Sequence, residues 1–177
     1  RQEIRDATAY FDVTLNPAND LKFERIANTP RRGLGESSLK SLHQLARAHN
    51  VPLMQAARLI VETEELKPKS RKALSDLIAA FDRWRSMIDT MRHTELAELI
   101  LDESGYTAMW QAEKSPQAQS KLENLKELIR FMEEFDTLAG FMEHVSLVMD
   151  AESEEGTERV NLMTLHSAKG LEFDVVF

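Results

Sequence analysis

Cysteine is absent from the 177 residues, and glycine and proline number only six and five. The absence of cysteine excludes a disulfide scaffold and a metal site built on thiolates, and it is typical of a protein from a reducing compartment. Aromatic residues make up only 7% of the chain, and β-branched residues do not form long runs. This composition predicts a structure in which helix dominates.

Long apolar runs are also missing. No stretch approaches the roughly 18 residues that a membrane-spanning helix needs, and no signal peptide opens the chain. We therefore expect no membrane contact and a cytoplasmic protein of bacterial type. Because the sequence begins without an initiator Met and ends in an apolar, strand-like run at 174–177, we also expect it to be a segment of a longer protein.

The chain has a net charge of −8, which taken alone argues against a nucleic-acid-binding protein. The charge is unevenly distributed, however, since residues 1–50 contain eight basic and six acidic side chains. Phosphate binding requires a local basic patch and not a basic protein. The five histidines show no metal-binding spacing, and no pair of carboxylates stands out as a catalytic acid and base.

Apolar residues recur at helical spacing through most of the chain. The pattern predicts a helix at 2–15 and about eight more helices between 16 and 158, with Trp84 and Trp110 in the core or an interface. Residues 150–158 contain five acids and no base, which is typical of a solvated linker. Residues 160–165 are strand-like and lead into a Ser-Ala-Lys-Gly turn, which predicts the edge of an α/β domain.

Two glycine-containing breaks are candidate phosphate sites. In the first, residues 31–35 (the Gly33 turn), two glycines allow a tight, positive-φ connection, and the next helix points its N-terminus outward. Such an arrangement suits a backbone phosphate of duplex DNA, and it would be contacted by Arg31, Arg32, Gly33, Gly35, Ser37 and Ser38. An ordinary helix–helix turn with two solvated arginines is the alternative.

The second break, residues 104–107 (the Gly105 turn), is a weaker candidate for the same contact. Gly105 and Thr107 would touch the duplex, and Lys114 and Lys121 follow downstream in the sequence. A plain turn without a ligand explains the pattern equally well.

The C-terminal residues 160–173, Val-Asn-Leu-Met-Thr-Leu-His-Ser-Ala-Lys-Gly-Leu-Glu-Phe, resemble motif V of superfamily 1 DNA helicases of the UvrD/Rep/PcrA type. Residues 1–7 resemble the helix that precedes the 2B insertion of these helicases. Residues 28–35 (Asn-Thr-Pro-Arg-Arg-Gly-Leu-Gly) and 121–128 (Lys-Leu-Glu-Asn-Leu-Lys-Glu-Leu) resemble two signatures within that insertion. The four segments follow the family order and span the whole chain.

The resemblance implies a mainly α fold. Residues 16–158 would form a multi-helix 2B insertion domain with a helix-hairpin-helix-like turn, and 1–15 and 159–177 would be short pieces of an α/β, RecA-like motor domain. The parent protein would be an ATP-dependent 3′→5′ DNA helicase of repair or replication restart that uses ATP and Mg. The insertion would contact duplex DNA at a single-strand junction and regulate unwinding by swivelling, with repair proteins as further partners.

The resemblance also assigns roles within motif V. Thr164, His166 and Ser167 would contact single-stranded DNA and couple it to ATP use, whereas Glu172, Lys169 and Gly170 would serve the nucleotide site. Without the motif, a loop His such as His166 is more often a hydrogen-bonding scaffold residue, and Glu172 is better explained as a half-exposed strand start. Because the chain contains no Gly-x-x-x-x-Gly-Lys-Ser/Thr loop, we expect no ATP hydrolysis from it alone and no catalytic residue within it.

Two other functions remain open at this point. In one, the acidic surface docks repair proteins and DNA contact is minor. In the other, the chain belongs to a helicase–nuclease of the AddA/RecB kind, in which a similar motif V occurs in a longer protein.

Overall fold

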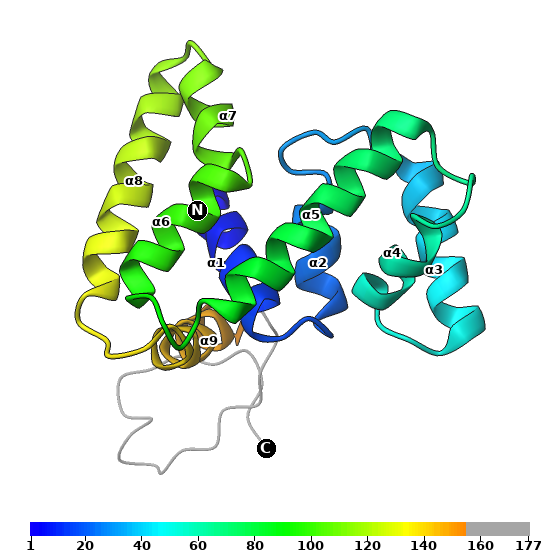
Figure 1. Cartoon of the computed structure of the whole chain (residues 1–177). Coiled ribbons are helices and arrows are strands. Elements are labelled where there is room, and N and C mark those ends of the chain that lie inside the picture. Colours follow the sequence, from blue (N-terminus) through cyan, green and yellow to red (C-terminus); the bar gives the residue numbers. More distant parts are fainter. Residues whose placement is uncertain (155–177) are drawn as a thin grey trace, which may run out of the picture. The chain divides into compact units, whose positions relative to one another are not determined.

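A computed structural model describes residues 1–154 of the chain, with side chains as far as residue 149. The chain divides into two compact units, Arg1–Val145 and Ser146–Phe177. Residues 1–154 form helices joined by short connections, without strands (Figure 1). The helices are α1 (Gln2–Leu15), α2 (Asp20–Ala27), α3 (Glu36–His49), α4 (Leu53–Ile60), α5 (Pro68–Ser86), α6 (His93–Glu103), α7 (Tyr106–Ala112), α8 (Pro116–Met132) and α9 (Leu138–Glu154).

The prediction of a mainly helical chain is thus confirmed for residues 1–154. The α/β edge expected at 159–177 lies outside the described residues. The linker expected at 150–158 overlaps them, and helix α9 extends through its first part to Glu154. The helix therefore continues into residues where the acid-rich sequence predicted a solvated linker.

Capping residues fix several helix ends. The side chain of Asn19 accepts a hydrogen bond from the backbone N–H of Lys22 at 3.2 Å and caps α2. The hydroxyl of Ser115 does the same for α8, accepting from the N–H of Ala118 at 3.1 Å. Proline occupies the first turn of both α5 and α8, where its fixed φ favours the helix and its missing N–H costs nothing.

Helix α1 lies at the centre of the core. It contacts α2, α5, α6 and α8, and its aromatic residue Tyr10 is fully buried. Phe81, Trp84 and Tyr106 surround Tyr10, with ring centroids 6.0, 6.5 and 6.1 Å away. Trp84 and Trp110 are buried as expected. Helix α1 shares one core with the helices that follow it, so the packing shows no domain boundary at residue 15. The boundary expected there stays a prediction.

Two carboxylates on α1 are buried, and both have partners. Asp6 accepts hydrogen bonds from Arg25 Nε at 2.7 Å and from the Tyr106 hydroxyl at 2.9 Å. Glu3 accepts one from Asn124 Nδ2 at 2.6 Å. These bonds link α1 to α2, α7 and α8. A buried charge that loses its partner is strongly destabilising, so the carboxylates fix how these helices pack.

The two glycines of the Gly33 turn differ in conformation. Gly33 has a φ of +76°, which other residues adopt only with strain. Gly35 has a φ of −79° and a ψ of −176°, the extended geometry of an N-cap residue, and it caps α3. The expectation that both glycines serve a positive-φ turn is therefore wrong for Gly35, because the chain reverses at Gly33 and has already straightened two residues later.

This difference predicts opposite effects for the same substitution. Gly33→Ser should lower the free energy of unfolding by about 1–2 kcal/mol because of the left-handed φ. In addition, the new Cβ would lie 2.8 Å from Ser70 Oγ. Gly35→Ser should leave stability unchanged or raise it by a few tenths of a kcal/mol, since serine is a better N-cap than glycine. Urea unfolding followed by circular dichroism measures both, and a larger loss for Gly35→Ser than for Gly33→Ser would contradict the structure.

Candidate nucleic-acid interface

The predicted site residues fall into two groups. Thr164, His166, Ser167, Lys169, Gly170 and Glu172 lie outside the described residues, so the structure does not test their roles. The residues expected to contact duplex DNA lie at the Gly33 and Gly105 turns, which the structure describes in full.

The Gly33 turn is held by a side chain that precedes it. Asn28 Oδ1 accepts hydrogen bonds from the backbone N–H groups of Arg32, at 2.7 Å, and Leu34, at 3.2 Å. The side chain of Leu34 is buried in the core. Sequence reasoning missed this role of Asn28, although an Asn placed just before a turn commonly hydrogen-bonds to the backbone that follows it. The turn is therefore fixed before any ligand binds.

Arg32 points into the protein. Its Nη1 and Nη2 atoms donate five hydrogen bonds between them, and four of these go to backbone carbonyls. The acceptors are the carbonyls of Ile26 (2.9 Å), Ala27 (3.2 Å), Pro30 (3.3 Å) and Ser104 (2.9 Å) and the hydroxyl of Tyr10 (2.8 Å). With both terminal nitrogens engaged, Arg32 has no terminal donor left for a phosphate. We therefore remove Arg32 from the duplex contact and assign it a structural role.

The Arg32 side chain joins the two glycine turns, which the sequence presents 72 residues apart. Its bond to the Ser104 carbonyl ends next to Gly105, which has a φ of +79°. A Cβ added at Gly105 would lie 3.7 Å from Pro30 Cγ, so the two turns lie against each other.

Tyr10 completes this network between the turns. Its hydroxyl accepts from Arg32 and donates to the carbonyl of Thr29 at 2.6 Å. Burial raises the pKa of Tyr10, and the nearby Arg32 guanidinium opposes that rise only in part. The hydroxyl therefore stays protonated at neutral pH and remains a donor.

Arg31 is the exposed arginine of the pair. It makes no ion pair or side-chain hydrogen bond with any described residue and lies on the surface beside Gly33. Helix α3 begins shortly afterwards at Glu36, and its N-cap residue Gly35 offers no side-chain cap. Ser37 is exposed in the first turn of the helix, and Ser38 is half-buried. Uncapped N–H groups at a helix N-terminus and a nearby cation both favour an anion, whereas the exposed carboxylate of Glu36 in the same turn opposes one.

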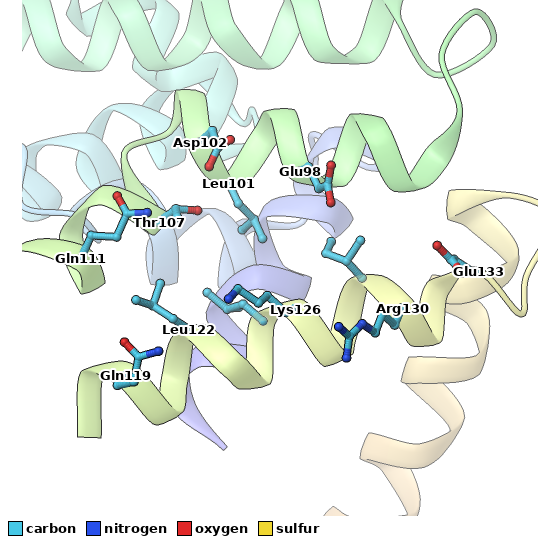
Figure 2. A pocket seen from close by; sticks show the side chains of 12 residues that line it. Glu98, Leu101, Asp102, Thr107, Gln111, Gln119, Leu122, Lys126, Arg130 and Glu133 are labelled. Carbon is cyan, nitrogen blue, oxygen red and sulfur yellow. The ribbon is translucent and has the colours of Figure 1, made fainter. Parts of the chain in front are cut away.

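Thr107, a half-buried candidate, lies in a different setting. It lines a groove of about 670 Å³ between α6, α7 and α8. Figure 2 shows Thr107 and Gln111 of α7 facing Leu122 and Gln119 of α8, with Asp102 and Glu98 on α6. Carboxylates at that rim repel a phosphate, so the groove does not add to the duplex contact.

The cations near this groove are already engaged. Lys121 Nζ lies 3.8 Å from the centre of the Trp110 ring, a cation–π contact. Lys126 and Arg130 pair with Glu123 and Glu127 of their own helix. Lys121, which the sequence suggested as an additional phosphate contact near the Gly105 turn, thus packs on Trp110 instead.

Two of the four described histidines, His43 and His93, have polar partners. His43 Nε2 lies 3.1 Å from Glu24 Oε2, and His93 Nε2 lies 2.7 Å from the carbonyl of Met132. No group of three metal-ligating side chains converges within the described part of the chain. Among the same residues, no helix combines the length and apolarity required to cross a bilayer.

Comparison with known proteins shows which family the chain belongs to. A model of the UvrD-like helicase C-terminal domain matches residues 1–177. The chain belongs to that family. It is 42% identical over 179 residues to DNA helicase II of Rickettsia typhi, covering 100% of the chain and 27% of that protein.

Other relatives carry related names. The ATP-dependent DNA helicase PcrA of Bacillus subtilis is 37% identical over 190 residues. The ATP-dependent DNA helicase UvrD1 of Mycobacterium tuberculosis is 37% identical over 201 residues. Each alignment covers the whole chain and 26% of the relative, so this member of the UvrD-like family spans about a quarter of the length of the proteins it matches. The resemblance to the UvrD/Rep/PcrA type is confirmed.

Substitution of Arg31 and of Arg32 should change the free energy of unfolding by different amounts. Arg32→Gln should lower the free energy of unfolding by about 2–3 kcal/mol, since part-buried carbonyls lose a charged donor that glutamine replaces only in part. Arg31→Gln should change it by less than about 0.5 kcal/mol, as expected for an exposed side chain without partners. Equal effects of the two substitutions in urea unfolding would contradict the network described for Arg32.

Proposed function

We propose that the chain is part of an ATP-dependent DNA helicase and that its helical region contacts the backbone of duplex DNA. The names of the relatives support a DNA helicase activity, and the names UvrD1 and PcrA favour a helicase of that type over the helicase–nuclease alternative. The single observation that supports the DNA contact is the Gly33 turn, where a fixed loop presents Arg31 next to the uncapped N-terminus of α3. Such a contact positions a duplex without reading its sequence.

The finer assignments form part of the same proposal. Residues 16–158 would be the 2B insertion, with 1–15 and 159–177 belonging to the motor domain, and the insertion would regulate unwinding by swivelling on its two connections. In the full-length protein, which would use ATP and Mg, Thr164, His166 and Ser167 would contact the single strand. Glu172, Lys169 and Gly170 would serve the nucleotide site.

Docking of a repair protein is the second candidate function. The groove between α6, α7 and α8 supports it, because Leu101, Leu122 and Ile129 give it an apolar lining beside the carboxylates of Glu98 and Asp102. An apolar groove with a polar rim is a common form of binding site. Duplex binding that does not depend on Arg31 would favour this candidate.

The proposed contact predicts weak, sequence-independent duplex binding, with a dissociation constant of roughly 10⁻⁴–10⁻⁶ M at physiological salt. Arg31→Gln should weaken binding about equally on all sequences. It should also flatten the slope of log K against log salt by about 0.9, because one phosphate contact and its released counterion are lost. Fluorescence titration of a labelled forked duplex at several salt concentrations measures both quantities.

Arg130→Gln is the matched control for Arg31→Gln. Arg130 is exposed and carries the same charge, but it pairs with Glu127 on α8, so its substitution should leave the salt slope unchanged. If Arg31→Gln and Arg130→Gln give the same affinity and slope, the Gly33 turn is a turn without a DNA-binding role.

A further inference from the structure

A second basic segment lies at the start of α5. Residues 67–72 read Lys-Pro-Lys-Ser-Arg-Lys, with four basic residues among six and no acid. The two arginines of the Gly33 turn are more than thirty residues earlier in the chain, so the sequence gives no reason to group the two segments.

The structure brings these segments together. Ser70, in the middle of the basic segment, is buried, and its hydroxyl donates a hydrogen bond to the carbonyl of Gly33 at 3.0 Å. The approach is close enough that a Cβ on Gly33 would lie 2.8 Å from Ser70 Oγ. Figure 1 shows the connection between α2 and α3 running past the N-terminal end of α5. The first turn of α5 is therefore attached to the Gly33 turn.

Two of the four basic side chains in the segment have partners within the protein, and two do not. Arg71 Nη1 donates to the carbonyl of Thr63 at 2.9 Å, and Lys72 Nζ pairs with Asp76 at 2.9 Å. Lys67 and Lys69 are exposed, and neither forms an ion pair or a side-chain hydrogen bond with any residue that the structure describes. The two lysines nearest to Ser70 on its N-terminal side are thus the ones available to a ligand.

We propose that Lys67 and Lys69 join Arg31 in one phosphate-binding surface, and that the surface takes the backbone of duplex nucleic acid. The inference deepens the proposed function and rests on it. The Ser70–Gly33 hydrogen bond holds together the two segments that carry these three free cations, and each cation can neutralise one phosphate of a densely charged duplex backbone. Because flexible lysines act as point charges and do not read bases, the added contact is independent of sequence.

Acidic residues set one limit of this surface. Glu64 and Glu65 are exposed just before the basic segment, and their charges repel a phosphate that extends in that direction. The exposed Glu36 in the first turn of α3 sets the other limit, so the duplex would pass over Lys67, Lys69 and Arg31 between the two. The nearby acids also keep the affinity weak, as a motor that must move along DNA requires.

The test compares two double variants of the chain that remove the same charge. Lys67→Gln/Lys69→Gln should weaken binding of a labelled duplex and flatten its salt slope by about 1–2 units, because each phosphate contact contributes about 0.9. Lys126→Gln/Arg130→Gln removes two exposed cations that pair with acids on α8 and should leave the slope close to that of the parent chain. Neither pair is buried, so both variants should keep the parent's circular-dichroism melting curve.

The outcomes separate this inference from the proposed function. If Arg31→Gln weakens duplex binding but Lys67→Gln/Lys69→Gln does not, the inference is overturned and the proposed function stands. If both double variants weaken binding equally, net charge and not this surface is responsible, which also overturns the inference. Polyglutamate that competes with the duplex at equal charge concentration would show that the surface takes acidic protein instead. Failure of the parent chain to bind any duplex would overturn both proposals.

Discussion

The hydrogen bonds of one half-buried guanidinium, that of Arg32, hold the candidate site in place. Arg32 satisfies carbonyls at the end of α2, where a helix leaves its last carbonyls without intrahelical partners. The same group reaches Tyr10 on the central helix α1 and Ser104 at the end of α6. Because a charged donor makes strong bonds to carbonyls, one side chain fixes the position of the Gly33 turn against both the core and the Gly105 turn.

This arrangement divides two neighbouring arginines between two roles. Arg32 faces inward and stabilises the turn, whereas Arg31 faces solvent and remains free. The Ser70 hydroxyl and the Asn28 amide oxygen then restrain the backbone on either side of Gly33. The chain thereby presents cations on a support that does not need to be ordered by the ligand, which lowers the entropic cost of binding. Such preorganisation suits the duplex contact proposed for this member of the UvrD-like family.

Much of the helical fold follows from the sequence, since apolar periodicity and proline breaks locate the helices and the burial of Trp84. The family also follows from it, because the motif V residues and the segments before them occur in family order. What the sequence does not reveal are the contacts between distant segments. Whether Arg31 or Arg32 is free depends on Ser104, and whether Gly33 or Gly35 requires a positive φ depends on how the turn meets Ser70. Local sequence patterns contain no information on these contacts between segments that are distant in the chain.

The central claim is that Arg32 couples the two glycine turns, and amide hydrogen exchange tests it most directly. In the Arg32→Gln variant, we predict faster exchange both at residues 28–35 and at residues 104–110, with the amides of α3 and α4 close to their rates in the parent chain. Local opening exposes only the amides whose supporting contacts are lost. Faster exchange confined to residues 28–35, with residues 104–110 unchanged, would contradict the account.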